Sequence, residues 1–114
     1  MADEGTPEVP RPGRPVRGSE TGRPIMAALD LLGRRWALRV IWELHQGPAG
    51  FRELQRRCER MSSSVLSTRL EELTTARVVA GGDRYRLTPL GERLVRALLP
   101  LQEWSDAWDA DLRE

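Results

Sequence analysis

The segment that most constrains the fold lies in the middle of the chain, at residues 61–76 (M-S-S-S-V-L-S-T-R-L-E-E-L-T-T-A). Leu66, Leu70 and Leu73 recur with the spacing of one helix face, and Ser62 is placed to cap that helix. The opposite face carries small hydroxyl groups where an ordinary surface helix carries long charged side chains. These hydroxyls belong to Ser63, Ser64, Ser67 and Thr68. The segment predicts a helix that is buried on one side and presents a short polar surface on the other.

Apolar periodicity and turn residues predict three helices before this segment, and a hairpin followed by a long helix after it. The expected ranges are 24–32, 36–46 and 51–58 for the helices, 78–80 and 84–88 for the strands, and 89–112 for the last helix. We expect Pro100 to kink or split this last helix. The order H-H-H-H-E-E-H, with a tight turn between the third and fourth helices, is that of a winged helix-turn-helix, a mainly α fold with a small β-hairpin.

Composition divides the chain into two parts. Residues 1–22 hold four of the eight prolines and four of the ten glycines, with few apolar side chains, so we expect a disordered arm there and one domain over residues 23–114. No apolar run is long enough to span a membrane, and the arm lacks the hydrophobic stretch of a signal peptide. Cys58 is the only cysteine, which fits a reducing cytoplasm.

Charge is distributed unevenly although the net charge is only +1. Residues 23–69 carry nine arginines and four acidic residues, a local charge of +5, whereas residues 97–114 carry a local charge of −4. Every basic residue is arginine, whose guanidinium can hold a phosphate through two hydrogen bonds. This pattern predicts that the centre of the domain faces a polyanion and that the C-terminal end faces away from it.

Fold order and charge together predict binding to double-stranded DNA. The hydroxyl side chains of residues 62–68 are candidates for the groove. The candidate phosphate ligands are Arg52, Arg56, Arg69, Arg84 and Arg86. The alternative is that some of these arginines pair with Glu53, Glu71 or Glu72 on the surface.

The tryptophans and the apolar ridge of the last helix indicate a contact between subunits. One face of that helix carries Leu90, Leu94, Leu98, Leu101, Trp104, Trp108 and Leu112. The residues expected in a dimer interface, or lining a pocket for a small aromatic effector, are Trp36, Trp42, Leu101, Trp104 and Trp108. Cys58 continues an apolar face and is expected to be a buried, unreactive thiol. No metal cluster, cofactor motif or enzyme motif is present, so we expect neither catalysis nor a cofactor.

The chain resembles the HxlR-type winged helix regulators of bacteria over residues 23 to about 108. The resemblance is carried by R-P-I-M-A-A-L-D-L-L-G-R-R-W (23–36), G-P-A-G-F-R-E-L-Q-R-R (47–57), residues 61–73, Y-R-L-T-P-L-G (85–91) and L-L-P-L-Q-E-W (98–104). It implies a cytoplasmic transcriptional regulator that forms a homodimer through its first and last helices. It also implies that the second helix of the helix-turn-helix enters the major groove of a roughly palindromic operator.

Three positions depart from the family pattern. Arg23 stands where the family often has a cysteine before the proline, a cysteine that senses oxidants or electrophiles in some members. Gly50 stands where the family usually has arginine, and the hairpin is several residues shorter than usual. Two other functions therefore stay open for the same fold. One is a protein-interaction module, and the other is a ligand-sequestering protein, neither of which would bind DNA.

Overall fold

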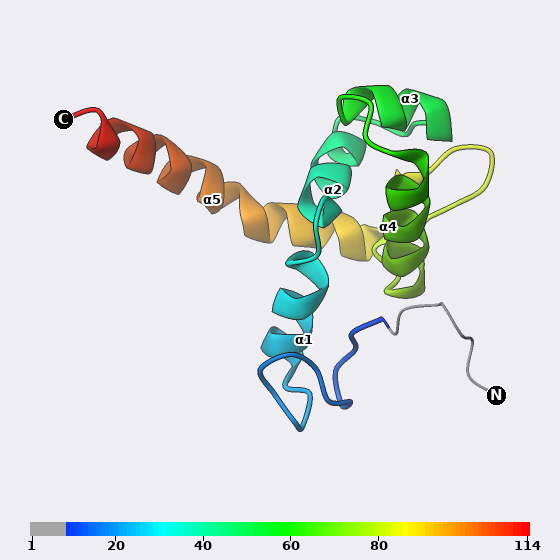
Figure 1. Ribbon diagram of the computed structural model, residues 1–114, viewed down its shortest axis with the longest axis horizontal. Helices are drawn as coiled ribbons and strands as arrows, with labels where there is room; N and C mark the ends of the chain where they lie inside the picture. Colours follow the sequence, from blue (N-terminus) through cyan, green and yellow to red (C-terminus); the bar gives the residue numbers. More distant parts are fainter. Residues whose placement is uncertain (1–8) are drawn as a thin grey trace.

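The computed structural model describes residues 9–114, which form five helices and one two-stranded hairpin (Figure 1). In chain order these are α1 (Pro24–Leu32), α2 (Ala37–His45), α3 (Phe51–Arg57), α4 (Ser63–Thr75), β1 (Val79–Ala80), β2 (Arg86–Leu87) and α5 (Pro89–Leu112). The predicted mainly α winged helix-turn-helix is confirmed, and each helix begins and ends within a residue or two of its expected range. No helix among the described residues is long and apolar enough to cross a membrane.

Local capping explains where α4 and α5 begin. The Ser62 hydroxyl accepts a hydrogen bond from the backbone N–H of Val65 at 3.2 Å. The Thr88 hydroxyl accepts one from the N–H of Gly91 at 3.0 Å, and Pro89 occupies the first turn of α5. Each cap satisfies an N–H that has no partner inside its helix. Both helix starts were therefore readable from the sequence.

Pro100 neither ends nor divides α5, which runs unbroken from Pro89 to Leu112. Of the two effects predicted for Pro100, a kink or a split, the split does not occur. Proline removes one hydrogen bond, the one to the carbonyl of Arg96, and this part of α5 is exposed. Water can bind that carbonyl, so the loss does not end the helix.

The hairpin is short and is attached to the loop before α3. Val79 pairs with Leu87 and Ala80 with Arg86 in antiparallel register. An isolated bridge between Ala49 and Tyr85 extends the pairing beyond the two strands. Leu87 is buried in the core, Tyr85 is half-buried and Arg86 is exposed. The strands are shorter than expected because the residues before β2 form bends instead of a longer ladder.

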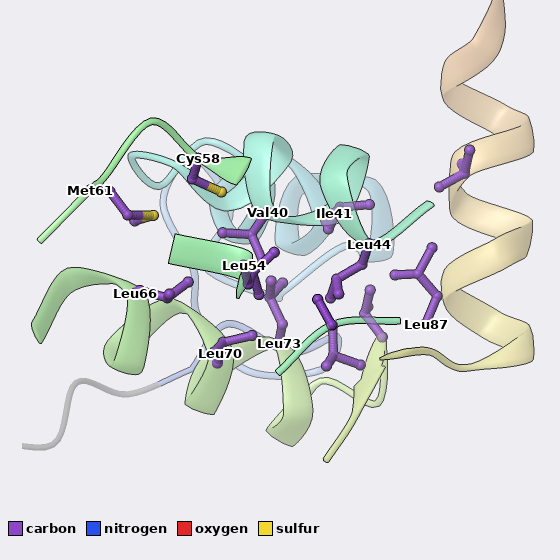
Figure 2. Close-up of a cluster of buried hydrophobic side chains, with 14 of the residues drawn as sticks. Val40, Ile41, Leu44, Leu54, Cys58, Met61, Leu66, Leu70, Leu73 and Leu87 are labelled. Carbon is purple, nitrogen blue, oxygen red and sulfur yellow. The ribbon is translucent and has the colours of Figure 1, made fainter. Parts of the chain in front are cut away.

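One hydrophobic core joins α2, α3, α4 and the hairpin. Figure 2 shows Val40, Ile41 and Leu44 from α2 in one cluster with Leu66 and Leu73 from α4. Leu54, Cys58, Met61, Leu70 and Leu87 complete the labelled cluster. This core fixes α3 and α4 relative to each other, and the buried face of α4 is the leucine face that the sequence predicted.

Two segments extend from this core. The second half of α5 projects away from the other helices (Figure 1), and Leu101, Trp104 and Trp108 on it are more than half exposed. Residues 9–22, which belong to the arm predicted from composition, form turns beside α1, with Pro10 buried and Val9 packed against the core. Residues 1–8 of the predicted arm lie outside the described residues.

Candidate DNA-binding surface

The turn between α3 and α4 sets the geometry of the helix-turn-helix. Glu59 and Arg60 both adopt left-handed backbone conformations, with φ of 57° and 62°. The turn is held by the N–H of Arg60, which donates to the carbonyl of Gln55 at 2.8 Å, and by the Gln55 side chain, which donates to the carbonyl of Met61 at 2.9 Å. Met61 is 5% exposed and anchors the turn in the core. The orientation of α4 is thereby tied to α3 through specific contacts.

The outer face of α4 is lined with hydroxyl groups. Ser62, Ser63, Ser64 and Ser67 are exposed, and Thr68 is half-buried at one edge of that face. The hydroxyls of Ser62 and Ser64 lie 3.0 Å apart, and the Thr68 hydroxyl donates to the carbonyl of Ser64 at 3.0 Å. Such short side chains let the helix backbone approach another surface closely, and each can donate or accept a hydrogen bond.

Two of the five predicted phosphate ligands stand free on α3. Arg52 and Arg56 lie one helical turn apart and are exposed. Neither side chain forms a hydrogen bond or ion pair with any of residues 9–114. Arg86 on the hairpin is exposed, and its side chain likewise has no such partner among the described residues. These three guanidinium groups are accessible to a ligand without first breaking an internal contact.

Arg69 has a different environment from the one predicted. Its Nε donates to the carbonyl of Arg35 at 2.7 Å, and its Nη1 lies 2.5 Å from Glu72 Oε1. The other oxygen of Glu72 accepts from Arg34 at 2.8 Å. The Arg69 side chain is only 17% exposed, so this arginine fastens α4 to the loop between α1 and α2. The structure therefore shows the alternative given for Arg69 in the sequence analysis, an ion pair with Glu72 in place of a free phosphate ligand.

Arg84 also has internal partners. Its Nη2 donates to the carbonyl of Pro48 at 2.7 Å and lies 3.2 Å from Glu53 Oε1. Glu53 is also bound by Arg57 at 2.9 Å, and this hydrogen bond holds the pKa of the Glu53 carboxyl below its ordinary value. Arg84 therefore attaches the hairpin to the start of α3.

Arg57 is a supporting residue that was not predicted from the sequence. Its guanidinium donates to the carbonyls of Glu43 at 3.2 Å and Gly47 at 2.7 Å, besides its bond to Glu53. These contacts hold the loop between α2 and α3, on which the position of α3 depends. Only the i, i+4 spacing of Glu53 and Arg57 could have indicated part of this network from the sequence.

The five residues predicted for a dimer interface or pocket do not form one site within a single chain. Trp42 and Leu101 line an apolar hollow of about 360 Å³ between α2 and α5. Trp36 packs against the core instead, with a left-handed φ of 74°. Trp104 and Trp108 stack on each other with ring centroids 5.3 Å apart and are exposed on the projecting part of α5.

Cys58 is fully buried, as predicted. Burial raises the pKa of its thiol, although the positive charges of Arg39 and Arg57 act in the opposite direction. The neutral thiol is a poor nucleophile. Among residues 9–114 there is no cluster of histidine, cysteine or carboxylate side chains that could hold a metal ion.

The paired helices, the hairpin behind them and the hydroxyl face of α4 define a winged helix-turn-helix protein. The family model described as HxlR-like helix-turn-helix matches residues 31–112, and the chain belongs to this family of transcriptional regulators. The family and its relatives are regulators and not enzymes.

Relatives agree in sequence and in structure. YvaP of Bacillus subtilis (strain 168), an uncharacterized HTH-type transcriptional regulator, is 30% identical over 71% of this chain and 82% of its own length. YodB of the same strain, an HTH-type transcriptional regulator, is 31% identical over 70% of this chain and 79% of its own. The crystal structure of quinone-bound YodB superposes with a TM-score of 0.68 at 32% identity, covering 73% of this chain and 94% of that one.

Proposed function

We propose that this transcriptional regulator acts as a homodimer that binds a roughly palindromic DNA site through α4. The observation that carries the proposal is the combination of a hydroxyl-lined outer face on α4 with two unpaired arginines, Arg52 and Arg56, on the helix that is fixed to it. In a helix-turn-helix, the second helix reads base edges while flanking cations bind phosphates. Hydroxyl groups discriminate bases weakly, so much of the affinity comes from the arginines.

The proposal of a homodimer is supported by the apolar surface of α1 and α5. Ile25 and Leu29 on α1 are each 56% exposed, and the ridge of α5 continues through Leu101, Trp104 and Trp108. Large exposed apolar surfaces of this kind mark protein interfaces. A twofold axis through this surface would place two copies of α4 on successive major grooves, about 34 Å apart.

The site for a small aromatic effector is the apolar hollow between α2 and α5. It is lined by Trp42 and Leu101, and it lies on the helix that carries the proposed dimer contacts. YodB, a relative, has been crystallised with a bound quinone. Because the one cysteine of this chain is buried, the effector here binds without a covalent bond to sulfur. Occupancy would alter the packing of α5 and so the spacing of the two α4 helices.

The test is a band shift with the DNA upstream of the gene, using the full chain, an Arg52→Gln/Arg56→Gln variant and Arg113→Gln as control. Arg113 lies at the far end of α5 and is paired with Asp109 at 3.1 Å. We expect the double variant to lose most of its affinity and the control to bind like the natural chain. Absence of a shift by the natural chain, with the fold intact, would contradict DNA binding and favour the protein-interaction alternative.

The effector is tested separately by titrating quinones and other small aromatics while tryptophan fluorescence and the band shift are recorded. We expect a fluorescence change that Trp42→Phe reduces, together with altered DNA affinity. If aromatic ligands bind tightly and no DNA is bound, the ligand-sequestering alternative is correct.

A further inference from the structure

A polar hollow runs along one edge of α4. It has a volume of about 430 Å³ and lies between α4, the end of α1 and the loop that joins α1 to α2. Its walls hold four arginines, Arg17, Arg34, Arg35 and Arg69, and two carboxylates, those of Asp30 and Glu72. The hollow therefore has an excess of positive charge.

The two carboxylates have partners of different strength in the walls. Glu72 accepts from Arg34 through one oxygen and from Arg69 through the other. Asp30 accepts the backbone N–H of Arg17 at 3.3 Å, and its second oxygen lies 3.9 Å from Arg17 Nε. Glu72 does not have to be released for an anion to enter, and its charge is balanced by two guanidinium groups. Asp30 keeps the backbone N–H of Arg17 when the Arg17 side chain turns to an anion.

Arg35 and Arg17 supply the positive charge that remains accessible. The guanidinium of Arg35 lies 5.9 Å from the centroid of the Trp36 ring, and the residue is exposed. Arg35 forms no hydrogen bond or ion pair through its side chain with any described residue. The Arg17 side chain is 91% exposed, and its 3.9 Å contact with Asp30 is too long for a hydrogen bond.

The hollow adjoins the surface that meets DNA in the proposed function. Thr68 lines the hollow and also belongs to the hydroxyl-bearing face of α4. When that face enters a groove, the strand that borders the groove passes along the edge of the helix. The chemical group this strand presents is a phosphodiester, an anion that guanidinium groups bind well.

We propose that Arg35 and Arg17 form a phosphate site for the DNA backbone beside α4, in the role that the sequence alone assigns to Arg69. This inference rests on the proposed DNA binding. Arg69 and Glu72 hold the loop at residues 33–36 against α4, so they fix where Arg35 is presented. The site acts on any duplex sequence, because it contacts no base.

The experiment measures duplex affinity across a range of salt concentrations for the full chain and for Arg35→Gln, Arg17→Gln and the double variant. A specific site selected from random DNA and a mixed-sequence duplex are both used. We expect each single variant to weaken both duplexes roughly fivefold at moderate salt, and the salt dependence to become shallower by about one for each phosphate that the variant no longer binds. Arg35→Lys, which keeps the charge, should retain most of the slope. Arg113→Gln is the matched control for loss of one arginine.

Several outcomes would overturn the site while leaving DNA binding intact. One such outcome is that the Arg17→Gln/Arg35→Gln variant keeps the natural duplex affinity and salt dependence, while Arg52→Gln/Arg56→Gln still weakens binding. Another is a weakening confined to the selected sequence, because that would indicate base recognition. A third arm titrates inorganic pyrophosphate by calorimetry. Binding that needs Arg35, without any change in duplex affinity, would make the hollow a small-anion site. If the natural chain binds no duplex, the proposed function itself is wrong.

Discussion

Glu72 on α4 and Arg34 in the loop before α2 form an ion pair of 2.8 Å, and the glutamate is only 4% exposed. Arg69 completes the arrangement from the opposite side. Although α4 is the helix proposed to contact DNA, two of its charged residues, Arg69 and Glu72, are turned toward the protein, whereas Glu71 between them is exposed.

Replacing Glu72 should destabilise the fold. Glu72→Gln leaves two partly buried guanidinium groups facing each other without their shared anion, and removing one partner of a buried ion pair typically costs about 3 kcal/mol. We expect a loss of this size in the free energy of unfolding, measured in urea by tryptophan fluorescence. The control is Glu71→Gln. Glu71 is adjacent to Glu72 but exposed, so this substitution should change the free energy of unfolding by less than about 0.5 kcal/mol. Equal stabilities for Glu72→Gln and Glu71→Gln would contradict a stabilising role for the buried ion pairs of Glu72.

Gly91 permits the close packing of α5 on the hairpin. A Cβ at this position would lie 2.3 Å from the carbonyl oxygen of Val78 and 3.3 Å from Leu87. The same carbonyl accepts the N–H of Thr88 at 3.0 Å, so it cannot move without disturbing the cap of α5. Alanine gains about 1 kcal/mol over glycine in helix propensity. The steric clash outweighs this gain, and we expect Gly91→Ala to lose about 2 kcal/mol of stability.

Thermal unfolding measures the loss of stability in Gly91→Ala, and Gly50→Ala is the matched control substitution. A Cβ at Gly50 would meet nothing within 4 Å, and its φ of −72° suits alanine. We expect a change within about 1 kcal/mol there. If Gly91→Ala proves more stable than the natural chain, the gain in helix propensity outweighs the steric clash. That result would contradict the close packing of α5 on the hairpin at Gly91.

Burial of Cys58 predicts a pH-dependent stability. Its thiol pKa in the folded protein is raised above the ordinary value of 9.0, so the unfolded chain loses the thiol proton first as pH rises. The unfolded state then binds fewer protons than the folded state, and stability falls above the unfolded pKa. Urea unfolding at pH 7 and pH 10 should show this decline, and Cys58→Ala should decline less.

The burial of Cys58 also predicts that its thiol reacts slowly in the native protein. Native protein should react with a thiol reagent far more slowly than protein unfolded in urea, because the thiol is neutral and inaccessible. Rapid labelling of the native chain would contradict the assignment of Cys58 as an inert core residue.

The exposed tryptophans of α5 should determine association. Trp104→Ser/Trp108→Ser removes stacked rings that are each more than half exposed in one chain, so the folded chain should lose little stability. Aromatic anchors of interfaces commonly contribute about 2 kcal/mol or more, which corresponds to roughly a thirtyfold rise in the dimer Kd. Sedimentation equilibrium measures this, with Glu103→Ser as control. A natural chain that sediments as a monomer would contradict the proposed homodimer.

Local signals explain what the sequence predicted well. The caps Ser62 and Thr88 and the leucine periodicity of α4 act over a few residues, so they could be read without any tertiary information. The fold and the boundaries of its helices followed from these signals. The hydroxyl face of α4 followed as well, because burial of one helix face exposes the other.

Arginine partners could not be predicted in the same way. Arg69 and the carbonyl of Arg35 are separated by 34 residues, and Arg84 and Glu53 by 31. Such contacts depend on how loops and helices pack, and every arginine has the same local preference for phosphate or carboxylate. Sequence spacing allowed Arg69 to pair with Glu72, but only the packed loop between α1 and α2 makes that pair buried. The accessible cations of this region are consequently Arg35 and Arg17.

The unbroken course of α5 through Pro100 has a mechanical consequence. A helix of this length spans about 36 Å, and it is clamped at its first turn where Gly91 meets the hairpin. Because the helix is continuous, a tilt of the stacked indole rings near its distal end would be transmitted along it to the hairpin. In the proposed homodimer, a rearrangement of the two subunits would reach the bound DNA by this route.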